Sequence, residues 1–319
     1  MMGTRPIRFG VIADVAKTKE SLVDLAKWAE ATGYSTILLR DHVVSHPFGH
    51  QLGPLVSMAT VAAVTERLRI GTLVISNDFR PPVQLAKEIA TLDLVSNGRI
   101  ELGLGAGFLK ADYNPLGIPF DPPGVRVSRL EESIRLLKLL FAGGEVTFHG
   151  EHYRLDAFDG FPVPVQRPHL PILVAGAGDR MLGIAAREAD IVGIQTVNTT
   201  SGEVVMDPAN WSASAIERKV EHIRTQAGSR FDDLELNTTI SLEITGDREA
   251  GAQSVIAQRG WQGVPVGEVL EMPALLIGSL PEIAQQIRER RDRYGLSYLV
   301  VSEKNAALAA PLVGELTGT

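Results

Sequence analysis

The sequence contains no cysteine, which excludes disulfide bonds, thiolate zinc sites and a cysteine nucleophile. Its net charge is only −7 over 319 residues, without a block of like charges, so it lacks the basic surface that nucleic acid or anionic lipid requires. Histidines, prolines and glycines interrupt the longest uncharged stretch, residues 42–65, which therefore cannot supply the about 20 apolar residues of a membrane span. Asp14 ends the short apolar run at residues 9–13, which is too short for a secretory signal. We expect a cytoplasmic protein with neither a nucleic-acid nor a membrane partner.

Short apolar runs rich in β-branched residues alternate with helical patterns along the chain. Most runs are continuous, which is typical of parallel strands buried on both faces. The expected strands cover residues 7–13, 35–40, 68–76, 99–105, 171–176, 189–195, 234–243 and 297–302. A first helix ends at Gly33, and further helices are expected at residues 55–65, 82–95, 124–141, 180–188, 212–227, 280–294 and 305–316. Eight strand–helix alternations predict an α/β fold of the (β/α)8 TIM-barrel type.

An ordinary barrel of this kind needs about 250 residues, so about 70 residues must lie in insertions. We place one insertion at residues 143–170, which are rich in proline and glycine. A second insertion covers residues 245–278, where little periodicity is visible. Neither a linker nor an internal repeat divides the chain. We therefore interpret residues 1–319 as a single domain.

The active site of such a barrel lies at the C-terminal ends of its strands. Those ends carry small residues, few charges and one histidine, His42. They contain neither a Ser–His–Asp set nor an evident pair of carboxylates for glycoside chemistry. This pattern indicates a slot for a flat ligand that brings its own chemistry.

Two glycine-rich segments each have two interpretations. Residues 103–107 are either a tight strand end or a surface that a planar ring can approach closely, because glycine has no Cβ. Residues 176–178 precede a helix, so their amides could hold a phosphate with Arg180 nearby, or they form a simple turn beside Asp179, which would repel an anion.

Asp41 and His42 form the strongest polar pair in the sequence. Asp41 either caps the next helix or accepts a hydrogen bond from a ligand, and His42 is either structural or catalytic. His42, His46 and His50 are spaced four residues apart, but Pro47 and Gly49 interrupt any helix that would align them. We therefore expect no metal site here.

Several segments together resemble the bacterial luciferase-like monooxygenases, in particular the branch that uses the deazaflavin coenzyme F420. They are residues 33–42, 68–74, 98–107, 117–120, 171–178, 218–220 and 295–301. The resemblance implies a (β/α)8 barrel, a catalytic His42 facing the ring or the substrate, and a homodimer to which helices 55–65 and 82–95 could supply an apolar face. It also implies a set of cofactor-binding residues: Asp41, Leu73, Val74, Ser76, Asn77, Ala106, Gly107, Ala175, Gly176, Ala177, Gly178 and Gln195.

The resemblance also implies a feature of the third strand and reveals a departure from part of the family. In the family this strand carries a bulge with a non-prolyl cis peptide, which here matches the bond between Leu73 and Val74. The sugar-phosphate dehydrogenases of the family carry a glutamate as proton donor where this chain has Phe108, and a tryptophan where it has Val44. Phe108 therefore indicates a more apolar pocket and a less polar substrate, while Tyr113 and Tyr153 could supply hydroxyls.

Three functions are consistent with these features. The first is an F420-dependent oxidoreductase that transfers hydride between the deazaflavin and a small organic substrate. The second is an FMN-dependent monooxygenase that receives reduced flavin from a separate reductase. The third is a flavin-binding protein without catalytic activity, against which the intact pair of Asp41 and His42 argues.

Overall fold

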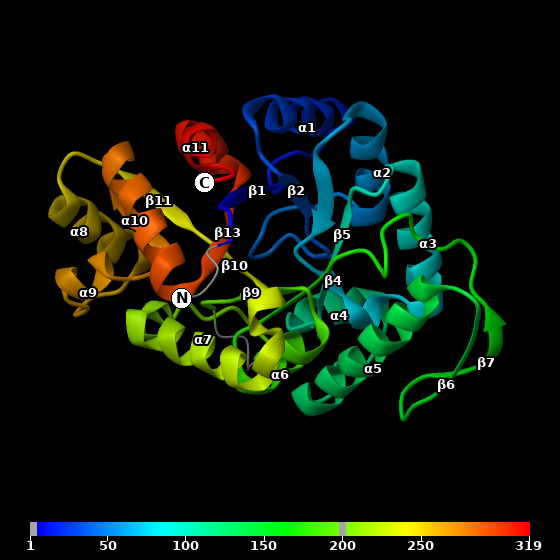
Figure 1. Cartoon of the computed structure of the whole chain (residues 1–319). Coiled ribbons are helices and arrows are strands. Elements are labelled where there is room, and N and C mark those ends of the chain that lie inside the picture. The colour runs from blue at the N-terminus through cyan, green and yellow to red at the C-terminus, as the bar shows by residue number, and fades with distance from the viewer. Residues whose placement is uncertain (1–4, 198–201) are drawn as a thin grey trace.

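The computed structural model describes residues 5–197 and 202–319. Eight parallel strands close into a barrel, with β3 and β5 completing the ring, and helices surround it (Figure 1). In sheet order the barrel contains β3 (Arg69–Thr72), β2 (Thr36–Leu39), β1 (Arg8–Ile12), β13 (Leu296–Ser302), β10 (Glu235–Thr239), β9 (Ile191–Ile194), β8 (Ile172–Gly176) and β5 (Ile100–Gly105), and the short β4 (Ile75–Ser76) continues the line of β3. This confirms the predicted (β/α)8 architecture.

The outer layer consists of helices that follow the barrel strands. They are α1 (Lys19–Thr32), α2 (Pro54–Val64), α3 (Pro82–Val95), α5 (Pro123–Ala142), α6 (Asp179–Glu188), α7 (Ala213–Ala227), α10 (Leu280–Tyr294) and α11 (Glu303–Leu316). Helix α1 begins at a capping box formed by Thr18 and Ser21, and ends where Gly33 adopts a left-handed φ of 94°. No helix of the described residues is long and apolar enough to cross a membrane.

Alternation along the strands divides the apolar residues between two cores. One set fills the barrel interior, and its sequence neighbours pack between the strands and the helices. The interior set comprises Ile12, Leu38, Leu73, Leu173, Ile191, Tyr298 and Val300. These buried side chains fill the barrel below its C-terminal end.

The N-terminal end of the barrel is closed by charged residues. Glu101 is 3% exposed and accepts hydrogen bonds from Arg8, at 2.7 Å, and from Arg69, at 2.5 Å. Arg8 also binds Glu235. Burial alone would favour the neutral acid, but the two guanidinium groups outweigh it and lower the pKa of Glu101. This network lies at the end of the barrel opposite to the expected active site, so its role is stability.

Both predicted insertions leave the barrel, but the second one is more ordered than expected. The first contains the antiparallel hairpin of β6 (Glu145–His149) and β7 (Arg154–Asp159). In the second, α8 (Arg248–Arg259), α9 (Val266–Leu270) and β12 (Leu275–Gly278) pack on a small core of their own. The expected strand at 234–243 is also split, because β11 (Ser241–Ile244) turns away from the barrel to pair with β12. Little periodicity in the sequence therefore did not mean little secondary structure there.

Candidate active site

His42 lies just beyond the end of β2 and is held from a distant segment of the chain. Its Nδ1 is 2.8 Å from Oδ2 of Asp112, a residue of helix α4 (Lys110–Leu116). The other oxygen of Asp112 accepts the amides of Val43 and Val44, at 2.7 and 2.9 Å. Burial alone would raise the pKa of Asp112, but the hydrogen bonds from His42 and the two amides outweigh it, so that pKa is lowered.

The ionised Asp112 determines which nitrogen of His42 carries a proton. A carboxylate can only accept hydrogen bonds, so Nδ1 of His42 must donate. In the neutral imidazole, Nε2 then holds a lone pair. Nε2 has no hydrogen-bond partner within the described chain, and the His42 side chain is 14% exposed. His42 is therefore oriented as a proton acceptor with one free nitrogen.

Two phenylalanines make the surroundings of His42 apolar. Phe48 stacks on the imidazole with 4.5 Å between ring centroids, and Phe108 meets it edge-on at 5.7 Å. The two tyrosines suggested by the sequence do not add free hydroxyls here. The hydroxyl of Tyr113 donates to Asp78, and that of Tyr153 accepts from Asn77. Phe48 was not identified from the sequence, although it lies only six positions after His42.

Asp41 is engaged by the protein itself. Arg80 forms a bidentate ion pair with its carboxylate, at 2.5 and 2.9 Å, and the amide of Ser76 donates to it. Asp41 therefore does not cap a helix, but fixes the loop between β4 and α3 against the end of β2. Sequence analysis missed Arg80, because nothing in a single sequence pairs two residues so far apart.

The third strand shows the predicted interruption. The Leu73–Val74 peptide is cis, and both residues lie outside the flanking strands β3 and β4, which confirms the expectation. The interruption of the third strand also explains why two positions of the fourth strand, 103 and 105, must be glycine. A Cβ on Gly103 would lie 1.9 Å from the carbonyl oxygen of Thr72, and one on Gly105 would lie 2.7 Å from a methyl group of Val74. Gly103 and Gly105 therefore admit the neighbouring strand, whereas contact of Ala106 and Gly107 with a planar ring stays a prediction.

The remaining small residues at the strand ends form a wall with few side-chain atoms. Ala106 and Gly107 follow β5, and a Cβ on Gly107 would lie 1.9 Å from the hydroxyl of Tyr113. Ala175 and Gly176 end β8, and Ala177 follows them. Together with the side chains around His42, they line the C-terminal end of the barrel.

The start of helix α6 is open on one side. Gly178 is its N-cap without a side-chain hydrogen bond, and a Cβ there would meet no atom of residues 5–197 or 202–319 within 4 Å. Arg180, however, donates to Gly124 and Ser128 of α5, so it does not reach back over the helix start. Lys219 lies in the segment 218–220 that resembles the family, although it was not named as a site residue. It donates to the carbonyl of the predicted site residue Gln195 at 2.7 Å.

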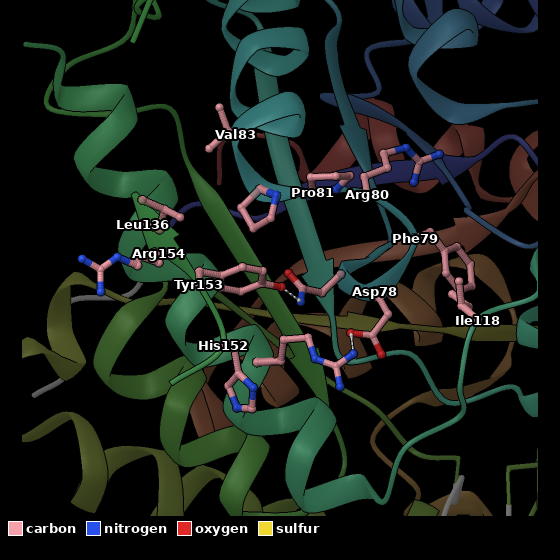
Figure 2. Close-up of a pocket in the computed structure, with 13 residues that line it drawn as sticks. Asp78, Phe79, Arg80, Pro81, Val83, Ile118, Leu136, His152, Tyr153 and Arg154 are labelled. Atoms are coloured by element: carbon pink, nitrogen blue, oxygen red, sulfur yellow. Dashed lines mark hydrogen bonds and ion pairs between the residues drawn. The ribbon is translucent and has the colours of Figure 1, made fainter. Parts of the chain in front are cut away.

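The loop after β4 lines a cavity of about 590 Å³ beside the barrel end. Pro81 and Val83 from the start of α3 and Tyr153 from the β6–β7 turn face this cavity (Figure 2). Asn77 donates to the Tyr153 hydroxyl at 3.1 Å, while its Oδ1 and Oγ of Ser76 are buried without a hydrogen-bond partner. These two predicted site residues therefore keep hydrogen-bonding capacity that the described protein does not use.

The chain also brings together Glu132, Glu151 and His152. The oxygens of Glu132 accept the amides of residues 151–153. This carboxylate therefore anchors the turn between β6 and β7 through its backbone amides.

A family model described as luciferase-like monooxygenase matches residues 6–295. The chain is 32% identical over 279 residues to a protein of Nakamurella multipartita named F420-dependent glucose-6-phosphate dehydrogenase, a match that covers 85% of this chain and 79% of the relative.

Among solved structures, a monooxygenase from Streptomyces bottropensis matches with a TM-score of 0.73 and 22% identity, over 97% of this chain and 98% of that chain. An F420-dependent secondary alcohol dehydrogenase, solved with an F420–acetone adduct, matches with a TM-score of 0.75 and 18% identity, over 98% of both chains. At these identities the structures establish a common fold.

Proposed function

The chain belongs to the luciferase-like monooxygenase family, and on that premise we propose that it is a coenzyme F420-dependent oxidoreductase that transfers hydride between the deazaflavin and a small, largely apolar alcohol or ketone. The relative from Nakamurella multipartita, named for F420 dependence, supports the cofactor. The observation that carries the proposal is the free Nε2 of His42, oriented by Asp112 and set between two phenylalanines.

The residues at the barrel end fit a planar cofactor with a phosphate. The small residues after β5 and in β8 leave room for a flat ring beside the strand ends. Oγ of Ser76 and Oδ1 of Asn77, which have no partner among the described residues, can form hydrogen bonds with polar atoms of that ring. The uncapped start of α6 at Gly178 offers free amides to a phosphate. Leu73, Val74, Ala106, Gly107, Ala175, Gly176, Ala177 and Gln195 complete the set that would hold it. F420, when bound, accepts or donates a hydride.

His42 accepts or donates the proton that accompanies hydride transfer. When an alcohol is oxidised, the carbon loses a hydride and Nε2 of His42 accepts the hydroxyl proton. In the reverse direction the protonated ring returns that proton to the carbonyl oxygen. Asp112 holds Nδ1–H throughout and stabilises the imidazolium that forms after proton transfer.

The apolar substrate class follows from the neighbours of His42. Phe108 and Phe48 present ring edges and faces rather than charged groups. Val44, where the family's sugar-phosphate dehydrogenases have tryptophan, contributes its amide to Asp112. A sugar phosphate would thus find neither the proton-donating glutamate nor the tryptophan. We therefore do not assign glucose 6-phosphate, the substrate in the name of the Nakamurella relative, to this chain.

Loss of absorbance at 420 nm tests this proposal. The F420-loaded protein should reduce its cofactor when given simple secondary alcohols, and should do so faster than with glucose 6-phosphate. A protein that oxidises glucose 6-phosphate best would overturn the substrate class. The FMN-dependent alternative would instead show oxygen uptake with reduced FMN.

We further propose a homodimer formed through α2 and its neighbour α3. Helix α2 carries no charged residue, although Val56 is 77% exposed on it, and a helix without a polar face is normally covered. On α3, Val95 is 62% exposed. Replacement of Val56 by lysine should convert a dimer to monomers in sedimentation, and an unchanged mass would contradict this interface. A cytoplasmic location stays a prediction.

A further inference from the structure

Asp14 and Arg40 are charged residues at the expected substrate end of the barrel that the mechanism above does not use. Arg40 follows Leu38 by two residues, and Leu38 belongs to the barrel interior, so the extended chain directs both side chains to the same side. Asp14 follows the neighbouring strand β1. Their side chains are only 18% and 12% exposed.

The pair is close enough to interact but leaves most hydrogen-bonding capacity unused. The shortest distance between the guanidinium and the carboxylate is 3.8 Å, too long for a hydrogen bond. Arg40 donates no hydrogen bond to any described residue, and Oδ1 of Asp14 is buried without a partner among those residues. Unpaired groups of this kind are costly when shielded from water. A ligand that supplies the missing partners therefore gains binding energy.

Arg40 lies close to the reaction centre proposed above. Its guanidinium carbon is 4.9 Å from the centre of the Phe48 ring, and the same ring stacks on His42 at 4.5 Å. A molecule placed against Phe48 and His42 therefore comes within reach of Arg40.

The charges around the pair decide what kind of group it accepts. Glu303 is satisfied by the amides of Val15 and Ala16, and the carboxylates of Asp41 and Asp112 have their own partners. Asp14 and Arg40 thus balance each other. Asp14 repels a carboxylate or phosphate, and Arg40 repels an amine. A neutral hydroxyl or carboxamide can donate to Asp14 and accept from Arg40 at the same time.

We propose that Asp14 and Arg40 together recognise a second, neutral hydroxyl or carboxamide group on the substrate, a few bonds away from the carbon that exchanges hydride. The inference rests on the proposed function, because it places the substrate at His42. It narrows the substrate to an apolar molecule with two neutral polar groups, such as a diol or a hydroxy ketone, since a phosphate in this place would face the carboxylate of Asp14.

Three alcohols built on the same six-membered ring test this proposal with the F420-loaded enzyme: cyclohexanol, 1,4-cyclohexanediol and 4-hydroxycyclohexanecarboxylate. In the wild type, kcat/KM for the diol should exceed that for cyclohexanol by at least about tenfold, since a buried polar site discriminates strongly against an analogue that leaves it unpaired. The carboxylate should be the poorest of the three. Arg40→Met should reduce the diol preference to near one, and Asp14→Asn should move the preference toward the carboxylate by about tenfold.

Asp24→Asn, at an exposed position of α1, is the matched control and should leave all three ratios unchanged. Thermal unfolding and the F420 dissociation constant of each variant show whether it is folded and loaded. Equal kcat/KM for diol and cyclohexanol in the wild type would overturn the inference, as would a wild-type preference for the carboxylate or oxidation of none of the three by a protein that binds F420. Failure to bind F420 at all would instead overturn the proposed function, and this inference with it.

Discussion

Asp112 holds His42 across 70 positions of sequence, with 2.8 Å between Oδ2 and Nδ1. The contact joins helix α4 to the end of β2. The same carboxylate also accepts two amides of the segment after His42, so one residue sets the position of the histidine, its tautomer and the path of its loop.

Asp112→Asn tests the orienting role. The amide keeps the shape of the side chain but can offer its NH2 group to Nδ1, which favours the opposite tautomer and leaves Nε2 protonated. We expect kcat for alcohol oxidation to fall by about 10²-fold or more, with little change in the dissociation constant of F420. A variant with wild-type kcat would contradict the role of Asp112 as a positioning residue.

His42→Ala tests the proton acceptor itself. A positioned general base typically contributes about 10²–10⁴-fold, so turnover should fall by that factor while F420 still binds. His50→Ala, at an exposed position, is the control and should keep full activity. Unchanged single-turnover hydride transfer together with a lowered melting temperature would show that His42 is only structural.

Gly103→Ala tests the approach of the third and fourth strands. Its Cβ would lie 1.9 Å from the backbone oxygen of Thr72, and neither strand can move without disturbing the barrel. We expect a loss of about 3 kcal/mol or more in the free energy of unfolding, by analogy with severe overpacking of a core. Gly314→Ala in α11 meets no atom within 4 Å and should instead stabilise the protein by about 0.5–1 kcal/mol. A tolerated Gly103→Ala would contradict the packing described here.

Glu101→Gln tests the charged network at the N-terminal end of the barrel. An amide cannot balance Arg8 and Arg69, and removal of one partner from a buried ion pair costs about 3–5 kcal/mol at neutral pH. The pKa of Glu101 is lowered in the folded protein, so the folded state binds fewer protons than the unfolded one. Its contribution is therefore present above the ordinary glutamate pKa of about 4.3 and is lost as the pH falls through the lower, folded value.

Urea unfolding of wild type and variant at several pH values checks this prediction. The difference in stability should be large at pH 7 and should shrink in acid. Glu145→Gln, at an exposed position of β6, is the control with little effect at any pH. A difference that stays constant down to pH 3 would contradict the account.

The barrel strands could be predicted from the sequence because a parallel strand buried on both faces is a continuous apolar run. The helices of the second insertion could not. The buried positions of α8 are Gly251, Ala252 and Val255, and small residues give a weak periodic signal. The break at Leu73 and Val74 was available only from the family resemblance, because two apolar residues in an apolar strand give no local sign of it.

Much of the candidate site depends on contacts between distant segments. His42 and Asp41 stood out because they end an apolar strand, but Asp112 and Arg80 lie 70 and 39 positions further on. Their partnerships exist only once the barrel brings strand ends together. Gly103 and Gly105 show a related limit. The glycines in the sequence indicated that another group comes close to the fourth strand, but not that this group is the third strand.

The central claim, dependence on F420, is tested most directly by fluorescence titration of the apo-protein with F420 and FMN side by side. We predict that F420 binds at least about tenfold more tightly, a difference of about 1.4 kcal/mol, and that its binding weakens as salt screens its negatively charged tail. Equal or tighter binding of FMN would contradict the claim and favour the monooxygenase.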